Sequence, residues 1–207
     1  GGRQQIVRLD YEQLLEVPEK TKEDFKVHLE ELIRENPTLV ISDYGKGMIS
    51  DEICTFLISI AKQHGTRVIV DPKGQNWAKY AGADLITPNV KELGDIIGHP
   101  ISNEDTGIEA SAKEIIRKYG LKALLVTRSE KGMSLISGQE TVHIPTHSQE
   151  VFDVSGAGDT VVAALALALT AGKDIKESIR IANIAAGIVV QKIGTATLTA
   201  EELRKAM

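Results

Sequence analysis

Four short apolar runs rich in β-branched residues recur along this chain, with helical stretches between them. The runs cover residues 39–42, 68–70, 85–87 and 123–127. Strands that alternate with helices are typical of parallel βα units, because a parallel crossover needs a long connection to return the chain to the same edge of the sheet. The pattern therefore predicts an α/β fold with a mainly parallel sheet.

Helix start and stop signals lie between these runs. Thr21, with Asp24 three residues later, and Ser50 each precede apolar residues at helical spacing, so each is expected to begin a helix. Another helix is expected from about residue 105 to residue 119, with Gly120 as its stop.

The second half of the chain has a different pattern. Residues 133–136 and 141–144 read as a hairpin, which predicts an antiparallel edge. Two helices follow, one over residues 161–171 and one after Asp174, and both are so apolar that they are expected to be buried. Residues 3–11 read as a separate extended strand.

Composition limits the classes of function. The chain has 207 residues, enough for one substantial domain, and a net charge of -5, which argues against a sequence-independent grip on nucleic acid. No apolar run approaches the roughly 20 residues that cross a bilayer, and no signal peptide is recognisable at the start. A cytoplasmic protein with a small-molecule substrate is the expectation.

Polar residues follow each predicted parallel strand. Asp43, Asp71, Asn89 and Thr127 stand where the apolar runs end. Ligands of open α/β sheets bind beyond the carboxyl ends of the strands, so four such residues on one edge predict a site. A single Asp there would be unremarkable, because Asp is also a common turn former and helix cap.

The strongest local signal is the small-residue turn at 155–160, directly before a predicted helix. Small residues let backbone N–H groups approach an anion, and the helix dipole adds positive charge, so the turn predicts a phosphate site. The alternative is a flexible helix start with Asp159 as a first-turn acid. A dinucleotide fingerprint is excluded because it needs a third small residue at the position of Val161. A Walker A loop is excluded because it needs Ser or Thr after its Lys, and Lys46 is followed by Gly47.

Residues 153–160, together with residues 89–92, resemble the paired signature of the ribokinase-like (PfkB) carbohydrate kinases. Within that family, residues 42–47, 71–74 and 126–135 are most similar to the kinases that phosphorylate D-glycero-β-D-manno-heptose 7-phosphate at O1, in ADP-heptose and lipopolysaccharide biosynthesis. The resemblance implies a three-layer α/β/α fold with a mainly parallel sheet, ATP and Mg²⁺ as cofactors, and a sugar phosphate as partner.

The resemblance also assigns roles to residues. It implies that Asp159 accepts the proton of the sugar hydroxyl and that the N–H groups of Gly156, Ala157 and Gly158 form an anion hole for the transferring phosphoryl group. Asn89 and Glu92 would organise the Mg-bound phosphates, directly or through water. An alternative is that Asn89 caps the next helix and Glu92 completes a capping box; both roles are compatible.

Further residues match the nucleotide and cation sites of the family. Those of the nucleotide-binding edge are Thr127, Ser129, Gly132 and, on the helix that lines the adenine in relatives, Asn183. Asp153 and Ser155 match positions that help to hold K⁺ in some members, with carbonyls near Gly194 as further ligands. Lys73 and Arg128 are candidate phosphate contacts, with solvated surface charges as the alternative.

One departure from the family concerns the N-terminal side. The strand-rich portion that carries the sugar-binding glycines and much of the lid has no counterpart here. We therefore expect residues 1–11 to be a lid or edge strand and residues 36–207 to form the nucleotide-binding core of a kinase domain whose N-terminal portion is missing. The open edge would favour a homodimer or another association through that strand. The isolated chain is expected to bind ATP or ADP weakly and to phosphorylate no sugar.

Two other functions stay open. The same fold could phosphorylate another sugar, sugar phosphate or nucleoside. The chain could also bind nucleotide, or pair with another polypeptide, without turnover.

Overall fold

Within the part of the chain that the structure describes, six strands form one sheet and lie side by side in sequence order. The structure is a computed structural model that describes residues 7, 9, 11, 17–147 and 151–207. The strands are β1 (Thr38–Ser42), β2 (Arg67–Asp71), β3 (Leu85–Ile86), β4 (Ala123–Thr127), β5 (Met133–Ser137) and β6 (Thr141–Ile144). The helices are α1 (Glu19–Glu35), α2 (Asp51–His64), α3 (Val90–Ile97), α4 (Asp105–Tyr119), α5 (Ala157–Thr170), α6 (Ile175–Val189) and α7 (Ala200–Ala206), with two short 3₁₀ turns, η1 (Ala78–Tyr80) and η2 (Ser129–Lys131).

The sheet has a parallel part and an antiparallel part. Strands β1 to β4 are parallel to their neighbours, and β5 and β6 complete the sheet as an antiparallel hairpin beside β4. Helix α2 lies in the crossover from β1 to β2, and α3 and α4 lie in the crossover from β3 to β4. The predicted α/β class, the parallel strands and the hairpin are confirmed.

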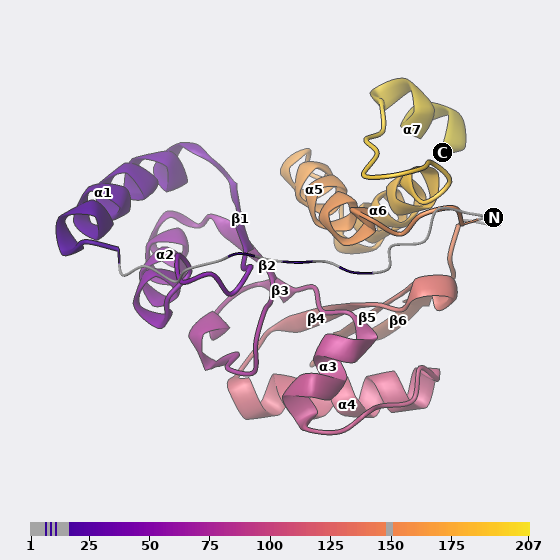
Figure 1. Cartoon of the computed structure of the whole chain (residues 1–207), viewed down its shortest axis with the longest axis horizontal. Helices are drawn as coiled ribbons and strands as arrows, with labels where there is room; N and C mark the ends of the chain where they lie inside the picture. The colour runs from indigo at the N-terminus through magenta and orange to yellow at the C-terminus, as the bar shows by residue number, and fades with distance from the viewer. Residues whose placement is uncertain (1–6, 8, 10, 12–16, 148–150) are drawn as a thin grey trace.

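Helices cover both faces of this sheet. On β2, Val68 and Val70 pack into a core that contains residues of α2, whereas Ile69 between them packs into a second core with α5 and α6. This alternation follows from the two-residue period of a strand. Figure 1 shows α3 and α4 on one side of the hairpin half of the sheet and α5 and α6 on the other. The three-layer α/β/α arrangement is thereby confirmed.

Most of the predicted helix ends are correct. Ser50 caps α2, because its hydroxyl accepts a hydrogen bond from the N–H of Ile53 at 3.2 Å. Gly120 ends α4 in the left-handed conformation at φ 62, which a residue without a Cβ adopts at little cost.

Two predicted helix starts are wrong. Helix α1 begins at Glu19, after Pro18, so Thr21 lies inside the helix and does not cap it. A proline suits a helix start because the first N–H groups of a helix have no intrahelical acceptor. Helix α5 begins at Ala157, four residues before the predicted start at 161.

Helix α5 also differs from the prediction in its burial. Leu165 is fully buried, as expected, but Leu167 is 71% exposed. Two residues along a helix correspond to a rotation of about 200°, so the side of α5 opposite the sheet carries Leu167 into solvent. The prediction that this apolar helix is buried on every side is therefore wrong.

The predicted strand over residues 3–11 lies largely outside the described residues. Val7, Leu9 and Tyr11, which are described, are exposed. The suggested division of the chain at residue 36 stays a prediction. Among the described residues, none of the helices has the length and apolar character needed to cross a bilayer.

Candidate functional site

The carboxyl ends of β2, β3 and β4 meet at one edge of the sheet. Asp71 is the last residue of β2 and Thr127 the last of β4. Asn89, just beyond β3, forms a parallel bridge with Thr127, whose N–H donates to the carbonyl of Pro88 at 2.9 Å. A pocket of about 180 Å³ opens here, and the residues that line it are Asp71, Thr87, Asn89, Glu92, Thr127, Gly156, Gly158, Asp159, Val161 and Val162. The structure therefore brings the predicted catalytic turn and the predicted phosphate residues into one site.

The start of α5 forms the side of this pocket that is predicted to bind an anion. Gly156 is the N-cap residue at φ 78, and a Cβ there would lie 3.3 Å from Cγ2 of Thr195, so both conformation and space favour glycine. Asp159 lies in the first turn of the helix. The N–H of Ala157 already donates to the carbonyl of Val154 at 3.2 Å. The exposed N-terminus still provides the partial positive charge that favours a phosphate.

Three carboxylates surround the pocket. Burial, and then the negative charges of Glu92 and Asp159, raise the pKa of Asp71 to about 6. Lys73 offsets part of this charge, and its Nζ lies 3.4 Å from Oε1 of Glu92. Such a cluster of oxygen ligands fits a hydrated Mg²⁺ that carries phosphates, because a cation would relieve the mutual repulsion. Among the described residues, no three acidic, His or Cys side chains stand close enough to bind a metal by themselves.

Asn89 and Glu92 form a capping box at the start of α3, which is the alternative role predicted for them. The side chain of Asn89 accepts from the N–H of Glu92 at 2.8 Å, and Oε2 of Glu92 accepts from the N–H of Asn89 at 3.1 Å. Only part of the Glu92 carboxylate is used in this way, because Oε1 faces Lys73. The capping role is confirmed, and the phosphate role stays a prediction.

Asp43, the strand-end residue of β1, does not line the pocket. It is buried, and its carboxylate accepts hydrogen bonds from Nζ of Lys79 at 2.6 Å, from Oη of Tyr80 at 2.7 Å and from the N–H of Gly45 at 2.7 Å. Burial alone would raise the pKa of Asp43, but the Lys79 contact and the other donors hold it below its usual value. These contacts show that Asp43 fixes the loop that follows β1, and its contribution to a ligand site stays a prediction.

That loop places a residue at the site that sequence reasoning missed. Oη of Tyr44 donates to Oδ1 of Asp159 at 3.4 Å, across 115 residues of chain. Tyr44 is 63% exposed. No local pattern predicts this contact, since it depends on how the loop after β1 folds around the carboxylate of Asp43.

The predicted nucleotide-binding edge lies on the turn between β4 and β5. Ser129 is in the left-handed region at φ 54, and Gly132 sits so close to β6 that a Cβ would lie 2.1 Å from the carbonyl oxygen of Ile144. Asn183 is buried on α6, and its Nδ2 donates to the carbonyl of Pro145 at 2.7 Å. Asn183 and Gly132 thus contact the same stretch of chain, and their role toward adenine stays a prediction.

The predicted K⁺ residues are also brought together. Oδ1 of Asp153 accepts from the N–H of Ser155 at 2.9 Å, and Oδ2 accepts from the N–H of Gly194 at 3.1 Å. These donors, Ser155 first, hold the pKa of Asp153 below its usual value. The contacts join the turn before α5 to the turn after α6, and K⁺ binding there stays a prediction.

Arg128, a candidate phosphate contact, points away from the site. Its side chain is 2% exposed and donates to Asn103, in the connection from α3 to α4, and to Asp105, the first residue of α4. For Arg128, both the phosphate contact and the alternative of a solvated surface charge are wrong, because the side chain is buried and its donors are used inside the protein. Lys73, in contrast, is half exposed beside Glu92, as a phosphate contact would need to be.

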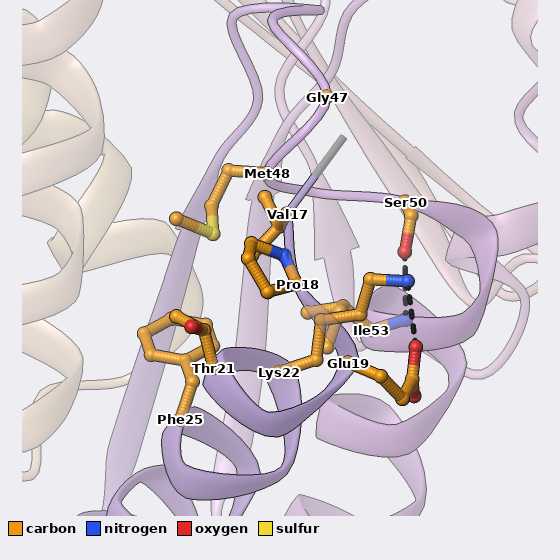
Figure 2. Close-up of a pocket in the computed structure, with 10 residues that line it drawn as sticks. All are labelled: Val17, Pro18, Glu19, Thr21, Lys22, Phe25, Gly47, Met48, Ser50 and Ile53. Atoms are coloured by element: carbon orange, nitrogen blue, oxygen red, sulfur yellow. Dashed lines mark hydrogen bonds and ion pairs between the residues drawn. The ribbon is translucent and has the colours of Figure 1, made fainter. Parts of the chain in front are cut away.

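A larger cavity, of about 690 Å³, lies elsewhere in the molecule (Figure 2). It is bounded by the start of α1, by Gly47 and Met48 of the loop after β1, and by Ser50 and Ile53 at the start of α2. None of the predicted catalytic or phosphate residues lines it. We assign the site to the smaller pocket because the predicted catalytic and phosphate-binding residues line it and do not line the larger cavity.

Fold and site define the class of protein. The pfkB family carbohydrate kinase profile matches residues 9–202, and the chain belongs to this family of ATP-dependent sugar kinases. It is 46% identical over 204 residues to the bifunctional protein HldE of Mesorhizobium japonicum and 43% identical over 205 residues to HldE of Aeromonas hydrophila. These alignments cover 99% of this chain but only 41% and 42% of the relatives. The predicted family is thereby confirmed.

Solved structures show the same fold. The Arabidopsis thaliana ribokinase complexed with ribose and ATP has a TM-score of 0.76 at 27% identity, and 86% of this chain aligns with 57% of that one. The Escherichia coli phosphofructokinase-2 in complex with potassium has a TM-score of 0.75 at 25% identity, and 89% of this chain aligns with 61% of that one.

Proposed function

We propose that this protein transfers the γ-phosphoryl group of ATP to O1 of D-glycero-β-D-manno-heptose 7-phosphate, in the cytoplasm, as a step towards ADP-heptose. The observation that carries the proposal is the pocket at the sheet edge, where Asp159, the Gly156 turn and the pair Asn89 and Glu92 line one space. Two observations support the choice of heptose. One is the sequence similarity to HldE proteins. The other is the resemblance of residues 42–47, 71–74 and 126–135 to the heptose 7-phosphate kinases.

The reaction needs one proton acceptor and a binding site for a transferring anion. Asp159 takes the proton from the O1 hydroxyl as the oxygen attacks the γ-phosphorus; the bond from that phosphorus to the bridging oxygen breaks, and ADP leaves with the bond electrons. The N-terminus of α5, with Gly156 and Gly158, faces the charge on the moving phosphoryl group. Phosphoryl transfer depends mainly on positioning and charge neutralisation, so these groups suffice without a covalent nucleophile.

Mg²⁺ would neutralise the ATP phosphates when bound, and Glu92, with Asn89 and Asp71 beside it, would hold it directly or through water. Thr127, Ser129 and Gly132 would face the nucleotide, and Asp153 and Ser155 would help to bind K⁺ next to the start of α5.

A panel of acceptors tests the substrate. The complete protein that contains these residues is assayed with ATP, Mg²⁺ and, in turn, heptose 7-phosphate, ribose, fructose 6-phosphate and a nucleoside. We expect the highest kcat/KM with heptose 7-phosphate. A higher value with another acceptor would assign the protein to another kinase of the same family, and nucleotide binding with turnover of no acceptor would support the non-enzymatic alternative.

A further inference from the structure

Arg128 is among the most deeply buried side chains of the molecule although it is charged. It stands between Thr127, the end of β4, and the turn η2 that contains Ser129, and its side chain is 2% exposed. A buried guanidinium is costly unless all its donors find acceptors. The acceptors that Arg128 finds therefore show which segments it holds together.

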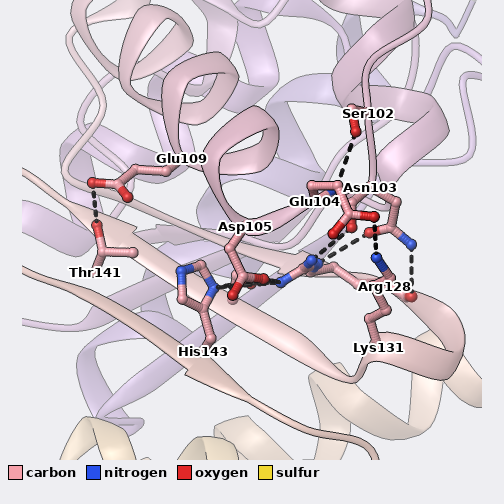
Figure 3. A network of polar contacts seen from close by, with 10 residues as sticks. Ser102, Asn103, Glu104, Asp105, Glu109, Arg128, Lys131, Thr141 and His143 are labelled. Atoms are coloured by element: carbon pink, nitrogen blue, oxygen red, sulfur yellow. Dashed lines mark hydrogen bonds and ion pairs between the residues drawn. The ribbon is translucent and has the colours of Figure 1, made fainter.

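The guanidinium is held by the connection from α3 to α4 and by the first residue of α4 (Figure 3). Nε donates to Oδ1 of Asn103 at 3.0 Å, Nη2 donates to the carbonyl of Asn103 at 2.7 Å, and Nη1 donates to Oδ1 of Asp105 at 2.6 Å. Asn103 completes the clamp from the other side, because its Nδ2 donates to the carbonyl of Arg128 at 3.2 Å. Side chain and backbone of Arg128 are thus fixed by the same neighbour.

The same guanidinium also reaches the hairpin. Nη1 donates to Oγ of Ser134 on β5 at 2.9 Å and lies 3.4 Å from Nδ1 of His143 on β6. Oγ of Ser134 and Nδ1 of His143 are themselves 2.7 Å apart. Arg128 therefore links the α3–α4 connection to both hairpin strands.

The backbone of Arg128 closes the turn that follows. Its N–H donates to the carbonyl of Gly132 at 2.8 Å, and the N–H of Lys131 donates to its carbonyl at 3.1 Å. Nζ of Lys131 adds a second tie to the α3–α4 connection, at 2.6 Å from Oε1 of Glu104. Residues 128–132 are therefore attached to the α3–α4 connection at both ends.

This turn needs such support. Ser129 has a positive φ of 54, and Gly132 adopts a positive φ of 79 against the backbone of β6. Backbone conformations of this kind persist only where the surroundings determine them. The contacts of Arg128 with Asn103 and Asp105 provide such surroundings for this turn.

We propose that Arg128, clamped by Asn103 and Asp105, is a positioning residue that sets nucleotide affinity by holding the turn at residues 127–132 in its shape. The inference rests on the proposed function, in which Thr127, Ser129 and Gly132 face the nucleotide. Arg128 touches no substrate; it acts through the turn.

Arg128→Lys and Asn103→Ala test the proposal in the complete protein. Lysine keeps the charge but cannot make the forked contacts with Asn103 and Asp105, and alanine removes the amide clamp while leaving Arg128 in place. Arg117→Lys, on the exposed face of α4, is the matched control. Binding of Mg·ADP is measured by calorimetry, and kcat and the KM for ATP by a coupled assay. We expect both clamp variants to weaken Mg·ADP binding and to raise the KM for ATP by about tenfold, with kcat at saturating ATP within about twofold of wild type.

Each result decides a different point. If wild type binds Mg·ADP and the clamp variants bind it equally well, the inference is overturned and the proposed function is not, even if the variants melt at a lower temperature. A change in kcat without a change in the KM for ATP also overturns it. If wild type does not bind Mg·ADP, the proposed function fails and the inference fails with it. Should Arg128→Lys not fold, Asn103→Ala decides the question.

Discussion

At the scale of single residues, Asp71 links the stability of the site to pH. Its pKa is raised to about 6, so the folded protein holds a proton that the unfolded chain releases near the ordinary value of 3.8. Folding is therefore favoured by this group at low pH, and that contribution is lost as the pH rises through about 6. By the usual conversion the effect is at most about 3 kcal/mol.

Asp71→Asn should remove this dependence. Asparagine has a similar shape and no charge, so the variant is expected to become more stable than wild type as the pH rises from 4.5 to 7.5, by about 1 to 3 kcal/mol at the upper end. Urea unfolding at several pH values measures the difference, with Asp95→Asn on the surface of α3 as the control. Parallel curves for wild type and Asp71→Asn would show that the pKa of Asp71 is not raised in the folded protein.

Glu92 carries two roles that one substitution separates. Glutamine can still complete a capping box, so Glu92→Gln should leave α3 and the thermal midpoint nearly unchanged. Losing the negative charge should raise the Mg²⁺ concentration for half-maximal rate about tenfold, because carboxylates hold hydrated Mg²⁺ better than amides do. An unchanged Mg²⁺ titration would leave Glu92 as a helix cap alone.

At the scale of elements, α5 both packs the core and presents the catalytic turn. Leu165 is fully buried against the sheet, so Leu165→Ala should destabilise the protein by about 2 to 5 kcal/mol through lost burial and a cavity. Leu167→Ala makes the same chemical change two residues away at a 71% exposed position and should cost less than about 0.5 kcal/mol. Denaturant unfolding of both variants compares them, and equal losses would contradict the packing of α5 described here.

Helices and strands with a regular spacing of apolar residues could be predicted from the sequence. Segments whose shape depends on contacts between distant residues could not. The strand and helix order follows from apolar spacing, and the caps at Ser50 and Gly120 follow from residue type. The loop after β1 gave no such signal. Its shape depends on the contact between Asp43 and Lys79, 36 residues apart, so the role of Asp43 in fixing this loop could not be predicted.

At the scale of the whole molecule, parallel topology explains why the site was predictable. The ends of parallel strands that are far apart in sequence meet at one edge, so Asp71, Asn89 and Thr127 could be expected together. The turn before Asp159 follows no parallel strand, and its place beside them was expected from the paired signature of the family. The pKa of Asp71 and the contact of Tyr44 with Asp159 could not be foreseen, because both depend on three-dimensional distances between side chains. The burial of Arg128 could not be foreseen either, because it depends on contacts with residues that are distant in the sequence.

Asp159→Asn tests most directly whether this protein is a sugar kinase with Asp159 as its proton acceptor. Phosphorus NMR follows the reaction of ATP with heptose 7-phosphate in the presence of Mg²⁺ and the complete protein. Calorimetry measures the binding of Mg·ADP to the same protein samples. We predict that wild type forms ADP and a phosphate ester at O1, and that Asp159→Asn binds Mg·ADP with nearly unchanged affinity but turns over roughly 10² to 10⁴ times more slowly. Turnover of Asp159→Asn at close to the wild-type rate would contradict the account.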